Sequence, residues 1–137
     1  MEEKETDCVL LLMRIYNKLL TDTCKFSKQG VANEFGRFFY SCSKLRDLTG
    51  MVKECNNLLE TFLLIKKNFA PMDEDQAHYA IAFNFPGILV SCTGKHWSKM
   101  SPVYLELSKS LFINVRRTLA CSITEIIRVL KKDALKV

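Results

Sequence analysis

The stretch that decides the fold runs from Ser108 to Leu130 and reads SKSLFINVRRTLACSITEIIRVL. In its second part, apolar side chains recur three or four residues apart, which predicts one buried face of an α-helix over 115–131. These side chains are Val115, Leu119, Ile123, Ile126, Ile127 and Leu130. Residues 111–114 predict a turn, and a helix over 100–110 comes before it. The stretch therefore predicts two helices joined by a short turn.

The bulk composition predicts a single globular domain. The chain has 137 residues, 48% of them hydrophobic and 26% charged, and only three prolines. A net charge of +5 without a run of lysine and arginine indicates a solvated surface rather than a nucleic-acid site. No apolar run is long enough to cross a membrane. We expect no nucleic-acid and no membrane partner.

The cysteines indicate a reducing compartment. They are too far apart in sequence for a zinc or redox motif, and the acidic N-terminus does not resemble a signal peptide. Most of them fall at apolar positions of helical patterns, where free cysteine behaves as a small hydrophobic residue. We expect buried, reduced thiols in a protein of the cytoplasm or the nucleus. The six are Cys8, Cys24, Cys42, Cys55, Cys92 and Cys121.

The rest of the chain carries the same helical periodicity. Residues 8–20 are apolar on almost every side, which predicts a helix buried on more than one side. Apolar residues at helical spacing predict further helices over 27–45, 47–69 and 74–93. No alternating pattern typical of a strand competes with them.

Capping residues mark the predicted helix ends. Asp47 is a predicted N-cap, Asp73 opens the next helix with a capping box, and Gly94 ends that helix. Ser101 and Pro102 predict the start of the following helix, because proline is tolerated at the first helical position.

Two residues inside the predicted helices point to packing constraints. Gly36 predicts a close approach to a neighbouring helix. Pro86 predicts a kink, because proline removes one backbone hydrogen bond from the helix.

The six predicted helices form three pairs: 8–20 with 27–45, 47–69 with 74–93, and 100–110 with 115–131. Helix pairs joined by short turns are typical of solenoids, and HEAT and armadillo repeats have a period of about 40–47 residues. We therefore predict an all-α fold, a HEAT/armadillo-like solenoid of about three antiparallel helix pairs in a single domain over 1–137.

Three short segments carry a resemblance to a known family. They are Asn-Phe-Pro-Gly at 84–87, Gly-Lys-His-Trp at 94–97 and Val-Arg-Arg-Thr-Leu-Ala at 115–120. In this order they resemble the HEAT-repeat regulatory subunits of protein phosphatase 4, of the subunit 1 and subunit 4 type. The resemblance covers 76–131, within a HEAT-like region over 73–131. Residues 1–70 match no motif and are read only as a helical repeat region.

The resemblance implies a non-catalytic regulatory or scaffold subunit that binds a serine/threonine protein phosphatase catalytic subunit. Members of that family are much longer, so it also implies a fragment or a shortened relative. The chain departs from HEAT turns, which usually carry an aspartate after the first helix, because Ser110 and Phe112 stand there. A HEAT-like adaptor for another protein partner is the alternative, and a closed helical bundle with its own cavity is a third hypothesis.

Four residues are candidates for partner binding. Arg116 and Arg117 begin the last helix, where cations oppose the helix dipole, so we expect a carboxylate from a neighbouring repeat or from a partner nearby. Asn114 is the predicted N-cap of that helix. Trp97 lies in a predicted connection, where it either fills the seam between repeats or contacts a partner. The predicted structural repeat positions are Pro86, Gly87, Val115, Leu119, Ala120, Ile123 and Ile126.

Nothing in the sequence predicts catalysis. The only histidines, His78 and His96, lack metal-ligand spacing, and a Ser–His or Cys–His nucleophilic pair is a minor alternative. The carboxylates of 73–75 are better explained as a solvated helix cap. We expect no enzyme activity, no metal and no cofactor.

The last helix predicts an apolar surface at one end of the solenoid. It is followed by no obviously polar capping repeat, which solenoids need for solubility. We therefore expect self-association through this uncapped repeat end, or its coverage by further repeats.

Overall fold

In the computed structural model, the chain is built from helices alone over the described residues, which are 2–45, 51–91 and 96–135. Side chains are described for 7–45, 52–91 and 96–131. The α-helices are α1 (Glu2–Leu20), α2 (Lys25–Asn33), α3 (Phe35–Ser43), α4 (Met51–Leu63), α5 (Glu74–Ser91), α6 (Trp97–Ser108) and α7 (Ile113–Leu135). Two 3₁₀ helices, η1 (Ile65–Asn68) and η2 (Pro71–Asp73), connect α4 to α5. The all-α prediction is confirmed for this part of the chain.

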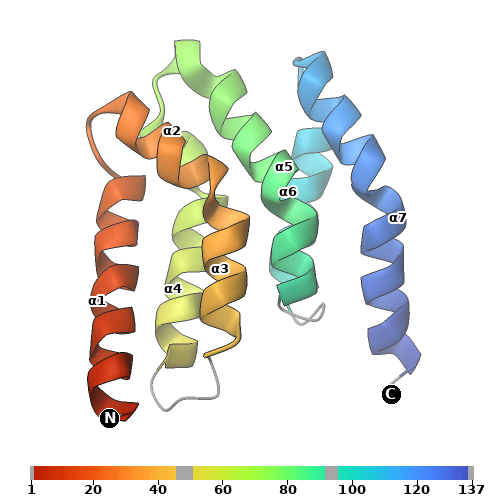
Figure 1. Ribbon diagram of the computed structural model, residues 1–137. Coiled ribbons are helices and arrows are strands. Elements are labelled where there is room, and N and C mark those ends of the chain that lie inside the picture. The colour runs from red at the N-terminus through yellow and green to blue at the C-terminus, as the bar shows by residue number, and fades with distance from the viewer. Residues whose placement is uncertain (1, 46–50, 92–95, 136–137) are drawn as a thin grey trace.

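The helices stand side by side, with α1 and α7 at opposite ends of the row (Figure 1). Helix α5 is central, because it packs against α2, α3, α6 and α7. Most of its side chains are buried, Ala77, Ile81, Phe85 and Leu89 among them. Its position therefore fixes the helices on both sides of it.

Two of the three predicted helix pairs pack as expected, α1 against α2 and α6 against α7. The middle pair is different, because α4 packs mainly against α1 and α3, and its 3₁₀ extension η1 provides the contact with α5. The segment 47–69 was expected to form one helix, but α4 ends at Leu63 and continues as η1.

The predicted helix over 27–45 is broken at Glu34 into α2 and α3. The cause is the side chain of Asn84 from α5. Its amide oxygen accepts the Gly36 N–H at 2.9 Å, and its amide nitrogen donates to the Ala32 carbonyl at 3.0 Å. In an unbroken helix, Gly36 N–H would bond to the Ala32 carbonyl. Asn84 is therefore inserted into the helical ladder and satisfies both backbone groups that it separates.

Gly36 makes the insertion of Asn84 sterically feasible. A Cβ atom at this position would lie 2.8 Å from Asn84 Oδ1. The predicted close approach at Gly36 is confirmed, and the neighbouring helix is α5. Gly30, in α2, has nothing within 4 Å of a Cβ position.

Aromatic packing fills the core on both sides of α5. Toward α1, Phe35 stacks on Phe62 with ring centroids 4.0 Å apart, and Tyr16 stacks on Phe38 at the same separation. The Tyr16 hydroxyl also donates to the Val31 carbonyl, and burial raises its pKa above the ordinary value. Toward α7, Phe85 meets a separate group of aromatic residues, Trp97 and Tyr104.

Several predicted helix boundaries are wrong. Helix α6 begins at Trp97 rather than at Ser101, so Pro102 lies inside it. Helix α7 begins at Ile113, so Asn114 is a helical residue and not the N-cap. Pro86 lies inside α5, as expected. Asp47, Cys92 and Gly94 lie outside the described residues.

The buried face of α7 is rotated from the predicted stripe. Val115, Leu119 and Ile126 are buried, but Ile123 is 47% exposed and Ile127 is 58% exposed. Ser122 takes the buried place instead, and its hydroxyl donates to the Leu119 carbonyl at 2.7 Å. A serine is tolerated there because its polar group is satisfied within its own helix.

The cysteine prediction is correct for two thiols and wrong for three. Cys42 and Cys55 are buried, whereas Cys8, Cys24 and Cys121 are exposed. Burial raises the pKa of Cys42 to about 12, with a smaller contribution from Cys55. Cys8, Cys24, Cys42 and Cys121 are free thiols.

The Asn84 insertion predicts opposite effects of two glycine substitutions. We expect Gly36→Ala to lower the free energy of unfolding by about 2 kcal/mol, because the methyl group displaces Asn84 and leaves buried polar groups unpaired. Gly30→Ala is the matched control, and we expect it to raise the free energy of unfolding by about 0.5–1 kcal/mol. Urea denaturation followed by circular dichroism measures both. Equal effects of the two substitutions would contradict the insertion.

Candidate interaction site at the turn edge

The connections within the helix pairs all lie along one edge of the molecule, the upper edge in Figure 1. They are 21–24 between α1 and α2, 64–73 between α4 and α5, and 109–112 between α6 and α7. We call this edge, with the first residues of α2 and α7, the turn edge. The starts of α1 and α4 and the end of α7 lie at the opposite edge.

Four apolar side chains of the turn edge project into solvent. Their exposed fractions are 92% for Leu111, 84% for Met72, 74% for Phe26 and 69% for Ile113. These are the highest values among the large hydrophobic side chains that the structure describes. Met72 and Leu111 lie in two of the connections, and Phe26 and Ile113 lie in the first turns of α2 and α7. Residues that are far apart in sequence therefore lie along the same edge. Strongly exposed apolar side chains along one edge make that edge a candidate protein-binding surface.

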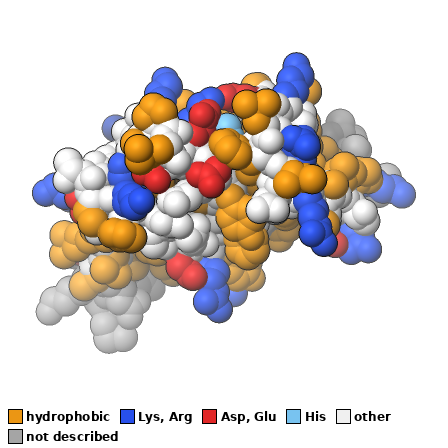
Figure 2. Space-filling model, turned by 90° about the horizontal axis from the view of Figure 1, so that it is seen from above, with side chains coloured by type: hydrophobic (Ala, Val, Ile, Leu, Met, Phe, Trp, Pro, Cys, Tyr) orange, Lys and Arg blue, Asp and Glu red, His pale blue; other side chains and the backbone are white. Residues whose placement is uncertain are grey.

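Two grooves flank the turn between α6 and α7. The first has a volume of about 530 Å³ and lies between η1, α5 and α6. The second has a volume of about 510 Å³ and is lined by residues of α2, α5 and the start of α7, including Asn33, Tyr79 and Asn114. Leu111 and Phe112 line both. Seen from this edge, Figure 2 shows hydrophobic side chains around a hollow that contains acidic side chains and a histidine.

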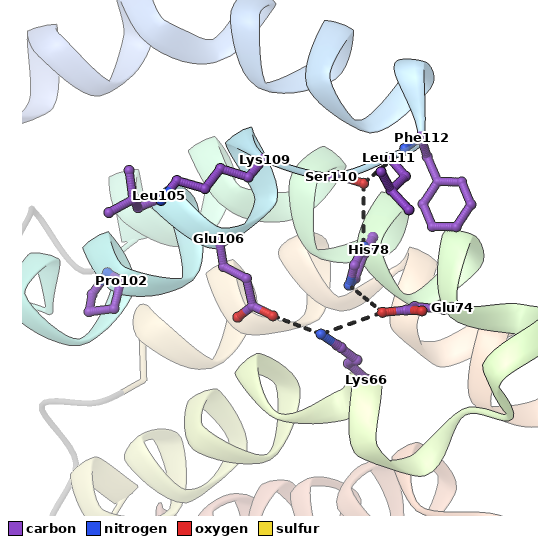
Figure 3. Close-up of a pocket in the computed structure, with 10 residues that line it drawn as sticks. All are labelled: Lys66, Glu74, His78, Pro102, Leu105, Glu106, Lys109, Ser110, Leu111 and Phe112. Carbon is purple, nitrogen blue, oxygen red and sulfur yellow. Dashed lines mark hydrogen bonds and ion pairs between the residues drawn. The ribbon is translucent and has the colours of Figure 1, made fainter.

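Lys66 is the electrostatic centre of the first groove (Figure 3). Its Nζ atom donates to Glu106 Oε1 of α6 at 2.7 Å and lies 3.4 Å from Glu74 Oε1 of α5. This lysine therefore links η1 to two helices. The hydrogen bond with Glu106 raises the pKa of Lys66 and lowers the pKa of Glu106.

His78 continues the polar contacts from Glu74 to the turn between α6 and α7. Its Nε2 atom lies 3.5 Å from Glu74 Oε1, and its Nδ1 atom lies 3.5 Å from the Ser110 hydroxyl (Figure 3). Burial, and then the positive charge of Lys66, lower the pKa of His78. The imidazole is therefore neutral at physiological pH, and its ring and that of Phe112 form a T-shaped pair with centroids 6.0 Å apart.

The Glu74–His78–Ser110 series has the residue types of a nucleophilic triad, but its geometry fits a structural link. The Ser110 hydroxyl accepts the Phe112 N–H at 3.2 Å, and its contact with His78 Nδ1 is at the outer limit of a hydrogen bond. His78 Nε2 is buried and forms no hydrogen bond with the described residues, although Glu74 Oε1 lies 3.5 Å away. Ser110 is also buried. Among the described residues, no group of three or more histidine, cysteine or acidic side chains could hold a metal ion.

Three of the four predicted binding residues lie next to the turn edge. Asn114 lines the second groove, and the Arg116 guanidinium donates to the Ser110 carbonyl. No carboxylate of the described residues forms an ion pair with Arg116 or Arg117, so the expected acidic neighbour is not found in this part of the chain. Arg117 is exposed.

Trp97 is placed differently. It is the first residue of α6, at the edge away from the grooves, and it is half-buried against Phe85 and Tyr104. Its contacts are those of a seam residue between α5 and α6. Among the predicted structural repeat positions, Val115, Leu119 and Ile126 are buried and Pro86 is half-buried. Gly87, Ala120 and Ile123 are exposed.

Sequence reasoning missed both main features of the turn edge. The exposed apolar residues could have been found, because Phe26, Met72 and Leu111 stand in connecting segments outside every predicted apolar stripe. The polar groove could not, because Lys66, Glu74 and Glu106 meet only when η1, α5 and α6 are packed together.

Comparison with protein-family models, curated proteins and solved structures gave no match for this chain. Helices long and apolar enough to cross a membrane are not found among the described residues.

The Lys66 contacts predict that the titrations of Glu106 and His78 both depend on Lys66. We expect Lys66→Met to raise the pKa of Glu106, which loses its hydrogen bond, and of His78, which loses a nearby positive charge. Nuclear magnetic resonance titration measures both. Lys99→Met is the control, because Lys99 forms a similar pair with Glu60, 3.1 Å away. An unchanged pKa of His78 in Lys66→Met would contradict the proposed coupling.

The same contacts predict how stability depends on pH. Because the folded protein resists protonation of His78, its free energy of unfolding should fall as pH drops below about 6.5, the ordinary pKa of histidine. The decrease in the free energy of unfolding should be smaller in Lys66→Met, because the pKa of His78 then differs less between the folded and the unfolded state.

Proposed function

We propose that this chain is a non-catalytic regulatory or scaffold subunit that binds a serine/threonine protein phosphatase catalytic subunit of the protein phosphatase 4 type. The proposal includes a HEAT-like solenoid arrangement of the helix pairs and a location in the cytoplasm or nucleus. It rests on the segments at 84–87, 94–97 and 115–120 that resemble the regulatory subunits, and on the form of the turn edge.

The observation that carries the binding role is that the four most exposed large apolar side chains of the described residues all lie on the turn edge. Burying them against a partner removes apolar surface from water, at about 25 cal/mol for each Å². The adjacent grooves give a partner concave places in which to seat its own side chains. Arg117 adds an exposed positive charge beside this surface.

The first test concerns the apolar side chains of the turn edge. In a pull-down with the protein phosphatase 4 catalytic subunit, we expect Met72→Asp and Leu111→Asp each to weaken binding about tenfold or more, because a carboxylate is then buried at the interface. Val52→Asp is the matched control, since Val52 is 55% exposed at the start of α4, on the opposite edge.

Failure of the unmodified chain to bind the catalytic subunit, where a longer relative binds, would refute the phosphatase role for this chain. Binding that is weakened equally by Val52→Asp would refute the assignment to the turn edge. Capture of a different protein through the same edge would support the adaptor alternative instead.

The second test concerns charge. We expect Arg117→Glu to weaken phosphatase binding roughly threefold to tenfold, with a larger effect at low salt, because exposed charges mainly accelerate association. Lys53→Glu makes the same charge change on α4 and should leave the affinity unchanged. Surface plasmon resonance at two salt concentrations measures the difference. If both variants lose the same affinity, Arg117 has no specific role.

A further inference from the structure

Helix α1 has two apolar faces, and only one of them is covered. Met13, Tyr16 and Leu20 are buried against the rest of the molecule. The adjoining face carries Leu11 and Leu12, whose exposed fractions are 57% and 55%. The sequence predicted burial on more than one side, and this is not observed within the single chain.

The uncovered face forms a continuous stripe along the helix. Its members recur at helical spacing on the side of α1 next to the buried face. They are Cys8, Leu11, Leu12 and Ile15, all of them exposed. We call this surface the α1 stripe. Because α1 is the outermost helix at one end of the row, no other described helix packs over the stripe (Figure 1).

The charges along α1 change sign from one end to the other. Its first turns contain Glu2, Glu3, Glu5 and Asp7 against Lys4 alone, and its second half contains Arg14 and Lys18. Residues 7, 11, 14 and 18 are three or four apart, so Asp7 and Lys18 border the same side of the α1 stripe. An antiparallel copy of this helix would set the acidic half of each α1 against the basic half of the other.

We propose that the α1 stripe is a self-association surface, on which α1 of a second copy of this chain packs antiparallel about a two-fold axis. A two-fold axis perpendicular to the two helices places the charged side of one α1 beside the charged side of the other α1. A register that sets Leu11 opposite Ile15 of the partner copy brings Asp7 beside Lys18 of the partner copy. By symmetry, this ion pair forms twice.

The other end of the row is less suited to self-pairing. The exposed stripe of α7 contains Ile123 and Ile127, but the exposed charges on α7 are mostly positive. Arg117, Arg128 and Lys131 are exposed, and Glu125 pairs with Arg128 in its own helix. Two copies of α7 would bring like charges together, which disfavours their association.

Arg14 gives the arrangement a further signature. Arg14 lies between Asp7 and Lys18 on the charged side of the α1 stripe. The two-fold axis therefore brings Arg14 close to Arg14 of the partner copy. The long side chain reaches solvent there, but the like charges weaken the pair. Neutralising Arg14 should therefore strengthen an antiparallel dimer, whereas a parallel pair would keep the two arginines on opposite sides.

The experiment is sedimentation equilibrium of the full chain and its surface variants. We expect a monomer–dimer equilibrium with a dissociation constant on the order of 10–100 µM, because one helix pair is a small interface. Asp7→Lys or Lys18→Glu should each weaken the dimer roughly tenfold, and the double variant should restore it. Leu11→Asp should abolish it, and Arg14→Gln should strengthen it.

Val52→Asp is the control for adding a carboxylate to an exposed apolar position, and it should leave the dimer unchanged. Circular dichroism establishes that each variant keeps its helical content. A chain that stays monomeric at about 1 mM overturns the proposal, as does a dimer that Leu11→Asp leaves intact. A double charge variant as weak as the single variants also overturns it, because the pairing of Asp7 with Lys18 would then be absent.

Discussion

The amide side chain of Asn84 holds the two halves of the structure together. It replaces one backbone hydrogen bond between α2 and α3. Its oxygen accepts the Gly36 N–H, and its nitrogen donates to the Ala32 carbonyl. The same nitrogen also donates to the Ala80 carbonyl within α5, at 2.8 Å. Because buried backbone groups are costly to leave unpaired, α5 is fixed at one height and rotation against the α2–α3 break.

The next residue of α5 connects to the other half. Phe85 points away from the break and contacts Trp97 and Tyr104, so adjacent residues of one helix bind its neighbours on either side. The turn edge depends on this central placement. Glu74 and His78 are carried on the first turns of α5, where they meet Lys66 from η1 and Ser110 from the turn before α7. A shift of α5 by one turn would separate all of these groups.

Most of the helices could be predicted from periodicity, because core positions repeat wherever one helical face is buried. Leu119 was expected on the buried face of its helix and is buried there. Phe35 and Leu59, which lie in the predicted helices over 27–45 and 47–69, are buried as well. The break at Glu34 could not be predicted, since its cause is a side chain far away in sequence. The first turns of α6 were misassigned because Pro102 has the sequence signature of a helix start. Ile123 and Ser122 show that tertiary packing, and not hydrophobicity alone, decides which side of a helix is covered.

The candidate site was less predictable than the fold. Arg116, Arg117 and Asn114 were selected on a local pattern, and the structure places them beside the two grooves. Trp97 was selected as part of a connection, but it lies within α6 on the opposite edge. Contacts such as that of Lys66 with Glu106 join residues from different helix pairs, so they cannot be predicted from a local sequence pattern.

The fit between Gly36 and Asn84 also has a consequence for evolution. An amide at position 84 is useful only when position 36 has no side chain, and a glycine at position 36 leaves a void when the amide is lost. Substitutions at the two positions should therefore covary. A homologue with alanine at position 36 should carry a smaller residue at position 84. Covariation of this pair across homologues would be a marker of the broken helix, even where the aromatic core has diverged.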